Sequence, residues 1–74
     1  MDQNIKKDIL EILSDIYKKS GGHNGITVIE ISQKLNLTFA DMKPTLTQMR
    51  IDKDFVLKKG KGDVLLFDKK KLNN

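Results

Sequence analysis

Apolar residues near the N-terminus recur at the spacing of an α-helix. From Ile5 to Ile16 they fall at positions i, i+4, i+7, i+8 and i+11, which places them on one helical face. Asp2 is suited to cap the start of this helix. The segment Ser20-Gly21-Gly22 is suited to end it, because glycine tolerates the left-handed conformation of a C-terminal cap. The pattern therefore predicts a first helix between Asp2 and Ser20.

A capping box predicts the start of a second helix. Thr27 and Glu30 have the Thr-x-x-Glu spacing in which each side chain accepts a hydrogen bond from the other residue's backbone N–H. Ile26 and Ile31 flank this box at the spacing of a hydrophobic staple. Asn36 suits the left-handed position after a helix end, so we expect the second helix between Thr27 and Asn36. Ile26 can also contribute a short edge strand.

A third helix is predicted soon after, but its start depends on Pro44. If Thr38 is the N-cap, with Asp41 completing a second capping box, Pro44 lies in the second turn and should kink the helix. If Asp41 is the N-cap, Pro44 falls in the first turn, where a missing N–H costs nothing. We expect this later start, or a distorted first turn. The residues expected to face the core are Met42, Leu46 and Met49.

Beyond Asp54 the pattern changes to that of a β-hairpin. Two apolar runs, Phe55–Leu57 and Val64–Phe67, flank the segment Lys59–Asp63, whose two glycines suit a turn and whose lysines have no core to enter. Residues 69–74 are basic and are expected to form a frayed tail. We therefore expect one folded domain over residues 1–68 and a basic C-terminal tail over residues 69–74.

The order of these elements resembles the winged helix-turn-helix superfamily. Residues 26–38 are similar to the second helix and turn of such domains, and residues 46–56 are similar to the end of the third helix and its lead into the wing, as the hairpin is called. Where many relatives have a glycine ahead of the wing, this chain has Lys53-Asp54. The resemblance implies a small α+β fold of three helices plus a C-terminal hairpin, with double-stranded DNA as partner. It also implies that the third helix enters the major groove and that the wing contacts the phosphate backbone or the minor groove.

The distribution of charge agrees with a polyanionic partner. From Phe55 onward the chain has six lysines and two aspartates, whereas acidic and basic residues balance before it, so the net charge of +4 belongs to this end. The candidate DNA contacts in the wing and tail are Lys58, Lys59, Lys61, Lys69, Lys70 and Lys71. The candidates in the third helix are Lys43 and Arg50 for phosphate or guanine, Thr47 for phosphate or a thymine methyl, and Gln48 for an adenine edge.

One observation favours an alternative function. Around the third helix the acidic residues Asp41, Asp52 and Asp54 equal the basic ones in number, and an apolar residue, Ile51, falls on the side expected to face DNA. A winged helix that acts as a protein-interaction module is therefore the alternative, with a patch formed by Ile51, Leu10 and Tyr17. A homodimer is a further possibility of the same class.

Composition argues against catalysis and against metal or cofactor binding. The chain has no cysteine, and its single histidine, His23, lies in a glycine-rich loop without a second ligand nearby, so we expect it to be solvent-exposed. No apolar run reaches membrane-spanning length, and the N-terminus lacks a secretory pattern. The sequence thus predicts a cytoplasmic, non-enzymatic protein without cofactor, metal or small-molecule ligand. We expect a transcriptional regulator or a plasmid or phage accessory protein.

Overall fold

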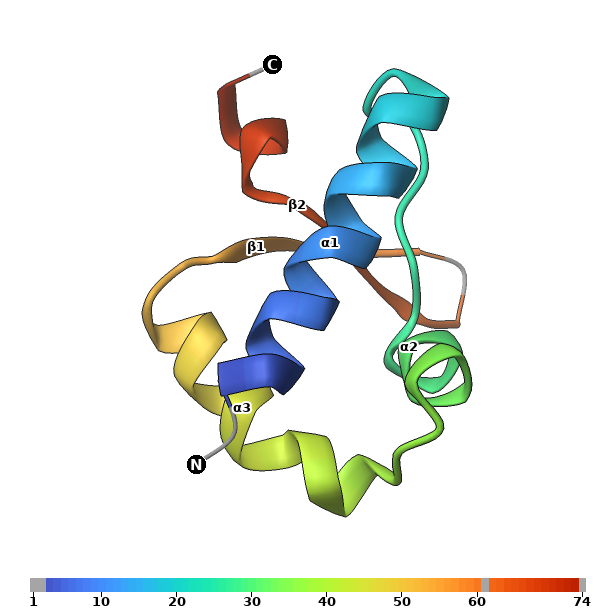
Figure 1. Cartoon of the computed structure of the whole chain (residues 1–74). Helices are drawn as coiled ribbons and strands as arrows, with labels where there is room; N and C mark the ends of the chain where they lie inside the picture. Colours follow the sequence, from blue (N-terminus) through green and yellow to red (C-terminus); the bar gives the residue numbers. More distant parts are fainter. Residues whose placement is uncertain (1–2, 61, 74) are drawn as a thin grey trace.

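The chain folds into three helices followed by a two-stranded antiparallel hairpin (Figure 1). The structure is a computed structural model that describes residues 3–60 and 62–73. Its elements are α1 (Gln3–Ser20), α2 (Val28–Leu35), α3 (Phe39–Ile51), β1 (Phe55–Lys59), β2 (Val64–Asp68) and the 3-10 helix η1 (Lys69–Asn73). The predicted α+β class is confirmed, and the layout is compatible with a winged helix.

The core lies where the three helices meet the base of the hairpin. Ile9 and Leu13 of α1 are fully buried there, as their helical spacing predicts. α1 ends at Ser20 and is followed by Gly21 and Gly22, which both have positive φ. The predicted cap at Asp2 lies outside the described residues. The other members of the core cluster are Ile26, Ile31, Met42, Leu46, Met49, Phe55 and Leu66.

Both predicted capping boxes form, and the second one corrects the expected start of α3. The Thr38 side chain accepts a hydrogen bond from the Asp41 N–H, and the Thr38 N–H donates to Asp41 Oδ2, each over 3.2 Å. The helix therefore begins at Phe39, and the later start at Asp41 is wrong. Pro44 lies in the second turn, but Pro44 and Ala40 are both exposed, so water can bind the Ala40 carbonyl that lacks a helical donor.

The end of α3 is closed by a left-handed residue that is not glycine. Lys53 has φ 58°, its N–H donates to the Arg50 carbonyl over 3.2 Å, and the Asp54 N–H donates to the Met49 carbonyl over 2.9 Å. Lys53 thus takes a left-handed backbone conformation that glycine adopts more readily. The turn leads directly into β1.

A short segment between α1 and α2, at Gly25 and Ile26, pairs with the hairpin. Ile26 forms an isolated antiparallel bridge with Leu66, in which the Ile26 N–H donates over 3.0 Å and the Leu66 N–H over 2.8 Å. Beside this bridge, a Cβ atom on Gly25 would lie 2.8 Å from both the Leu66 carbonyl oxygen and Phe67 Cε1. Because Gly25 has no side chain, β2 can approach the backbone at Gly25 and Ile26 closely.

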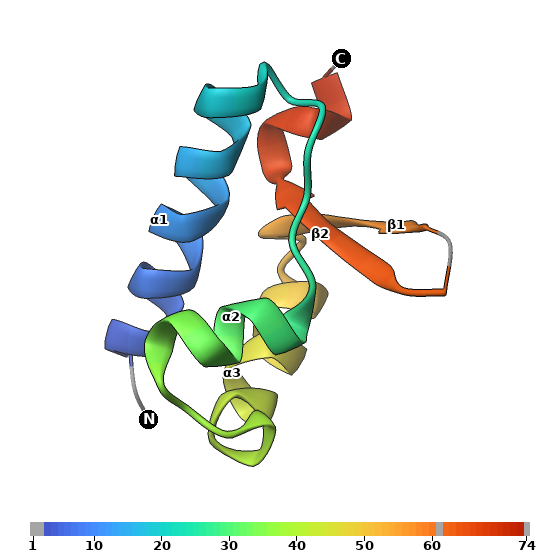
Figure 2. The ribbon, with the colours of Figure 1, turned by 90° about the vertical axis from the view of Figure 1, so that its right-hand side faces the viewer.

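The basic tail packs back onto the domain. The Lys71 ammonium donates to the Gly22 carbonyl over 2.6 Å and lies 5.4 Å from the centroid of the Phe67 ring. The expectation of a frayed end is therefore wrong for Lys69–Asn73, which forms η1 beside the loop that follows α1 (Figure 2). The acceptor is the carbonyl of Gly22, in the loop after α1, and the tail's own sequence does not reveal it.

Candidate nucleic-acid interface

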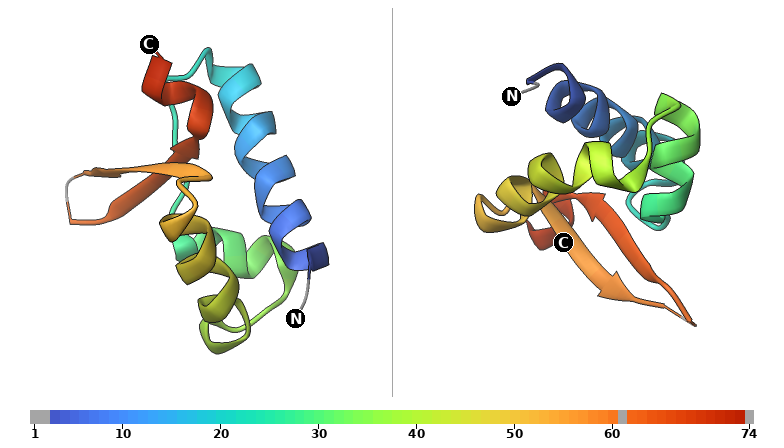
Figure 3. Two further views of the ribbon diagram at one scale, coloured as in Figure 1. Left: turned by 90° about the vertical axis from the view of Figure 1, so that its left-hand side faces the viewer. Right: turned by 90° about the horizontal axis from the view of Figure 1, so that it is seen from below.

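A groove lies between α3 and the hairpin. The hairpin projects from the helical body beside α3 (Figure 3). The groove has a volume of about 220 Å³. Its exposed lining comes from α3 and from facing positions of the two strands, while its inner end reaches buried residues of the core. The lining residues are Val28, Phe39, Lys43, Leu46, Thr47, Arg50, Phe55, Leu57, Val64 and Leu66.

The basic residues of α3 lie on the side of the helix that faces this groove. Lys43 and Arg50 are seven positions apart, which is close to two helical turns, so they share one side; Thr47 lies between them. All three side chains are exposed and line the groove. Within residues 3–60 and 62–73, neither Lys43 nor Arg50 has an ion-pair partner. Their charges are therefore available to an anionic ligand.

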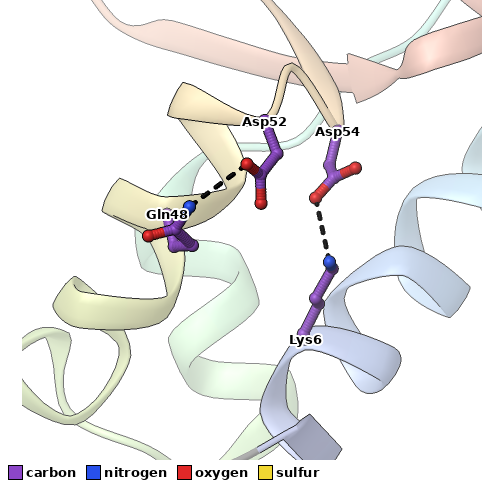
Figure 4. Close-up of polar contacts among 4 residues, drawn as sticks. All are labelled: Lys6, Gln48, Asp52 and Asp54. Carbon is purple, nitrogen blue, oxygen red and sulfur yellow. Dashed lines mark hydrogen bonds and ion pairs between the residues drawn. The ribbon is translucent and has the colours of Figure 1, made fainter.

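The acidic residues around α3 are engaged away from the groove. Asp41 belongs to the capping box, and Asp52 Oδ1 accepts a hydrogen bond from Gln48 Nε2 over 3.1 Å (Figure 4). Asp54 Oδ2 lies 3.2 Å from Lys6 Nζ, which joins the end of α3 to α1. The equal number of acidic and basic residues around α3 is the observation that favoured the alternative function. The basic residues Lys43 and Arg50 lie on the groove side of the helix, whereas the acidic residues lie elsewhere.

Gln48 is separated from the other three candidates of α3. It does not line the groove, and its side-chain amide donates to Asp52. About 100° of rotation per residue places it on the far side of the helix from Arg50. The structure thus brings together Lys43, Thr47 and Arg50 but not Gln48.

The hairpin lysines divide between its two faces. Lys59 pairs in register with Val64, and Lys58 pairs with Leu65. Because side chains alternate along a strand, Lys59 shares the groove face with Leu57, and Lys58 lies on the opposite face. Both lysines are exposed. The third candidate, Lys61, lies outside the described residues.

The tail lysines do not join this surface. Lys69 and Lys70 are exposed on η1, which lies by the C-terminal end of α1, whereas α3 is at the other end of the molecule (Figure 2). Lys71 is half-buried, and its ammonium contacts Gly22 and Phe67. The structure therefore places the tail candidates apart from those of α3 and the hairpin.

Sequence reasoning missed the apolar part of the groove. Phe39 is 55% exposed, Val64 48% and Leu57 39%, and all three line it. The exposure of the two strand residues could not be predicted, because a strand pattern alone does not say how far the hairpin extends beyond the helical body. Phe39 could have been found from the Thr38 capping box, which makes it the first residue of α3.

The apolar patch of the alternative function is only partly assembled. Ile51 is 67% exposed, but Leu10 and Tyr17 are half-buried, and Leu10 packs against the core cluster. Ile51 does not line the groove. It remains an exposed apolar residue at the end of α3.

Outside the groove, the described residues form a further hollow but no group of metal ligands. A hollow of about 520 Å³ beside α1 is lined by Lys6, Lys7, Leu10, Glu11 and Ser14. His23 is exposed, as predicted. In residues 3–60 and 62–73 no three histidine or acidic side chains are grouped as a metal site. No helix in the same ranges is long and apolar enough to span a membrane.

The chain matches no protein-family model, no curated protein and no solved structure.

Proposed function

We propose that this chain is a winged helix domain that binds double-stranded DNA through α3 and the β1–β2 hairpin. One observation carries the proposal: Lys43 and Arg50 face the groove without ion-pair partners among the described residues, while Asp41, Asp52 and Asp54 are engaged elsewhere. A regulatory or plasmid or phage accessory role agrees with this activity.

The proposed contacts are mainly with phosphates. In this arrangement α3 inserts its groove side into the major groove, and Lys58 and Lys59 approach the neighbouring backbone from the hairpin. Thr47 is the residue of α3 best placed to reach a base edge or a thymine methyl. Lys71 is left out of the interface because the domain itself binds its ammonium. Sequence discrimination by a single domain is expected to be weak.

The proposal predicts binding to a random duplex that depends strongly on salt and on the hairpin lysines. With roughly five phosphate contacts, affinity should fall by two to three orders of magnitude between about 50 and 200 mM salt. Fluorescence anisotropy measures this for the wild type and for a variant with Lys58, Lys59 and Lys61 changed to alanine, which we expect to lose most of its binding.

The control variants distinguish the effect of where the lysines lie from the effect of the protein's net charge. Changing the exposed α1 lysines Lys7, Lys18 and Lys19 to alanine removes the same charge away from the proposed interface. This control should retain near wild-type affinity, and Lys69→Ala with Lys70→Ala should have little effect. A folded wild-type protein that fails to bind DNA even at low salt contradicts the proposal.

A protein-interaction module is the second candidate, favoured by the 67% exposure of Ile51 at the end of α3. An Ile51→Lys variant distinguishes the two functions. For DNA binding, a new cation at this position should leave affinity unchanged or raise it a few-fold. For a protein interface, it should abolish self-association or partner binding. Anisotropy with duplex DNA and sedimentation of the protein alone measure these two outcomes.

A further inference from the structure

The groove between α3 and the hairpin has an apolar surface that DNA binding does not require. Phe39, Leu57 and Val64 are each more than a third exposed and line the same groove. A duplex presents phosphates, sugars and base edges there, so it offers few apolar groups to bury against these side chains. An apolar surface gathered in a hollow is instead typical of a site for a protein side chain.

The charged residues of the groove are all of one sign. Among the described lining residues the charged ones are Lys43 and Arg50, and no carboxylate accompanies them. Lys59 follows Leu57 on the same face of the hairpin. A ligand that fills this groove therefore meets apolar side chains in the hollow and cations beside them.

The size of the groove limits what can fill it. Its volume of about 220 Å³ lies below the range of roughly 300–1,000 Å³ in which most cofactors and drug-sized ligands bind. One bulky apolar side chain is the group of the right size. The chain that carries it must bring negative charge to Lys43 and Arg50, and a carboxylate can pair with the Arg50 guanidinium through two parallel hydrogen bonds.

We propose that this groove binds an acidic peptide segment of a protein partner. The peptide inserts one bulky apolar side chain among Phe39, Leu57 and Val64, and its flanking carboxylates pair with Lys43 and Arg50. Because these two cations are also the proposed phosphate contacts, peptide and DNA exclude each other. This exclusion rests on the proposed function, whereas peptide binding itself does not.

The test uses the full chain and a panel of fluorescein-labelled acidic peptides. Each peptide has a central Phe, Leu, Met or Trp flanked by aspartates and serines, and each has a counterpart with alanine at the centre. We expect at least one anchored peptide to bind about tenfold or more tightly than its alanine counterpart, because anchors in pockets dominate such interfaces. The same peptide should displace labelled duplex DNA, whereas the alanine counterpart should not.

Two variants change the apolar surface without changing charge. Phe39→Gln keeps a helix-forming residue, and Val64→Thr keeps the shape of the strand residue. Each should weaken binding of the anchored peptide about fivefold or more and reduce duplex binding by a clearly smaller factor, because the proposed DNA contacts are mainly between cations and phosphates. The matched control Ile51→Gln removes an exposed apolar side chain of α3 outside the groove and should change neither affinity. Circular dichroism verifies that each variant is folded.

The outcomes separate this inference from the proposed function. If the wild type binds DNA but every anchored peptide binds only as its alanine counterpart does, the peptide site is overturned and DNA binding stands. If an anchored peptide binds and DNA does not, the peptide site stands and the proposed function fails. A concentration-dependent dimer that Phe39→Gln dissociates, seen by sedimentation, assigns the groove to a second copy and also overturns the peptide proposal.

Discussion

Gly25→Ala is expected to destabilise the domain by about 1–3 kcal/mol, the usual cost of overfilling a close-packed site. The added Cβ would lie 2.8 Å from the Leu66 carbonyl oxygen, which accepts the Ile26 N–H, and 2.8 Å from the Phe67 ring. The backbone contact cannot be relieved by a rotamer change, so Ile26 and β2 must move apart. A domain of this size has only a few kcal/mol of stability, so the loss is a large fraction of it.

Urea denaturation followed by circular dichroism measures this effect. Gly60→Ala is the matched control, because a Cβ there would meet its nearest neighbours at an ordinary 3.5 Å. It should change the free energy of unfolding by less than about 0.5 kcal/mol. Equal stability of the two variants would show that the backbone at Gly25 and Ile26 does not approach β2 as closely as the bridge between Ile26 and Leu66 requires.

Replacing both groove-facing cations, by Lys43→Gln and Arg50→Gln, is expected to weaken duplex binding about a hundredfold. If non-specific binding with a Kd of roughly 10 µM is shared among about five phosphate contacts, each contact accounts for a factor of about ten. The log–log slope of affinity against salt should also become shallower by about two. Both quantities come from anisotropy titrations at several salt concentrations.

The control for this pair is Lys7→Gln with Lys18→Gln on α1, which makes the same change in net charge at exposed positions away from the groove. We expect its affinity to stay within about threefold of the wild type and its salt slope to be unchanged. Equal losses in the two double variants would mean that overall charge, and not the groove side of α3, attracts the duplex.

The helix limits could largely be predicted from the sequence because the signals are local. A capping box requires only two side chains three residues apart, and both boxes form at Thr27 and Thr38. The left-handed end of α2 at Asn36, with φ 56°, is equally local. The error at α3 came from giving the proline rule more weight than the second capping box. Exposure of Pro44 made its missing hydrogen bond less costly than expected.

The arrangement of the candidate site could be predicted only in part. Composition identified the basic residues, but a count of charges cannot show that Asp54 pairs with Lys6 or that Asp52 binds Gln48. The attachment of Lys71 to Gly22 depends on residues about fifty positions apart in the chain. Such pairings arise from packing, and neither charge patterns nor hydrophobic periodicity encode them.

The bridge between Ile26 and Leu66 has a consequence for motion within the hairpin. A two-stranded ribbon alone is marginally stable in water, and this bridge adds a third pairing at one level of the ribbon. Backbone amides at Ile26 and Leu66 should therefore exchange with solvent slowly. Those nearer the Lys59 and Val64 pair should exchange faster. We therefore expect the hairpin to be held firmly where it joins the core and to adjust farther out, where under the proposed function Lys58 and Lys59 would follow the backbone of a bent or irregular duplex.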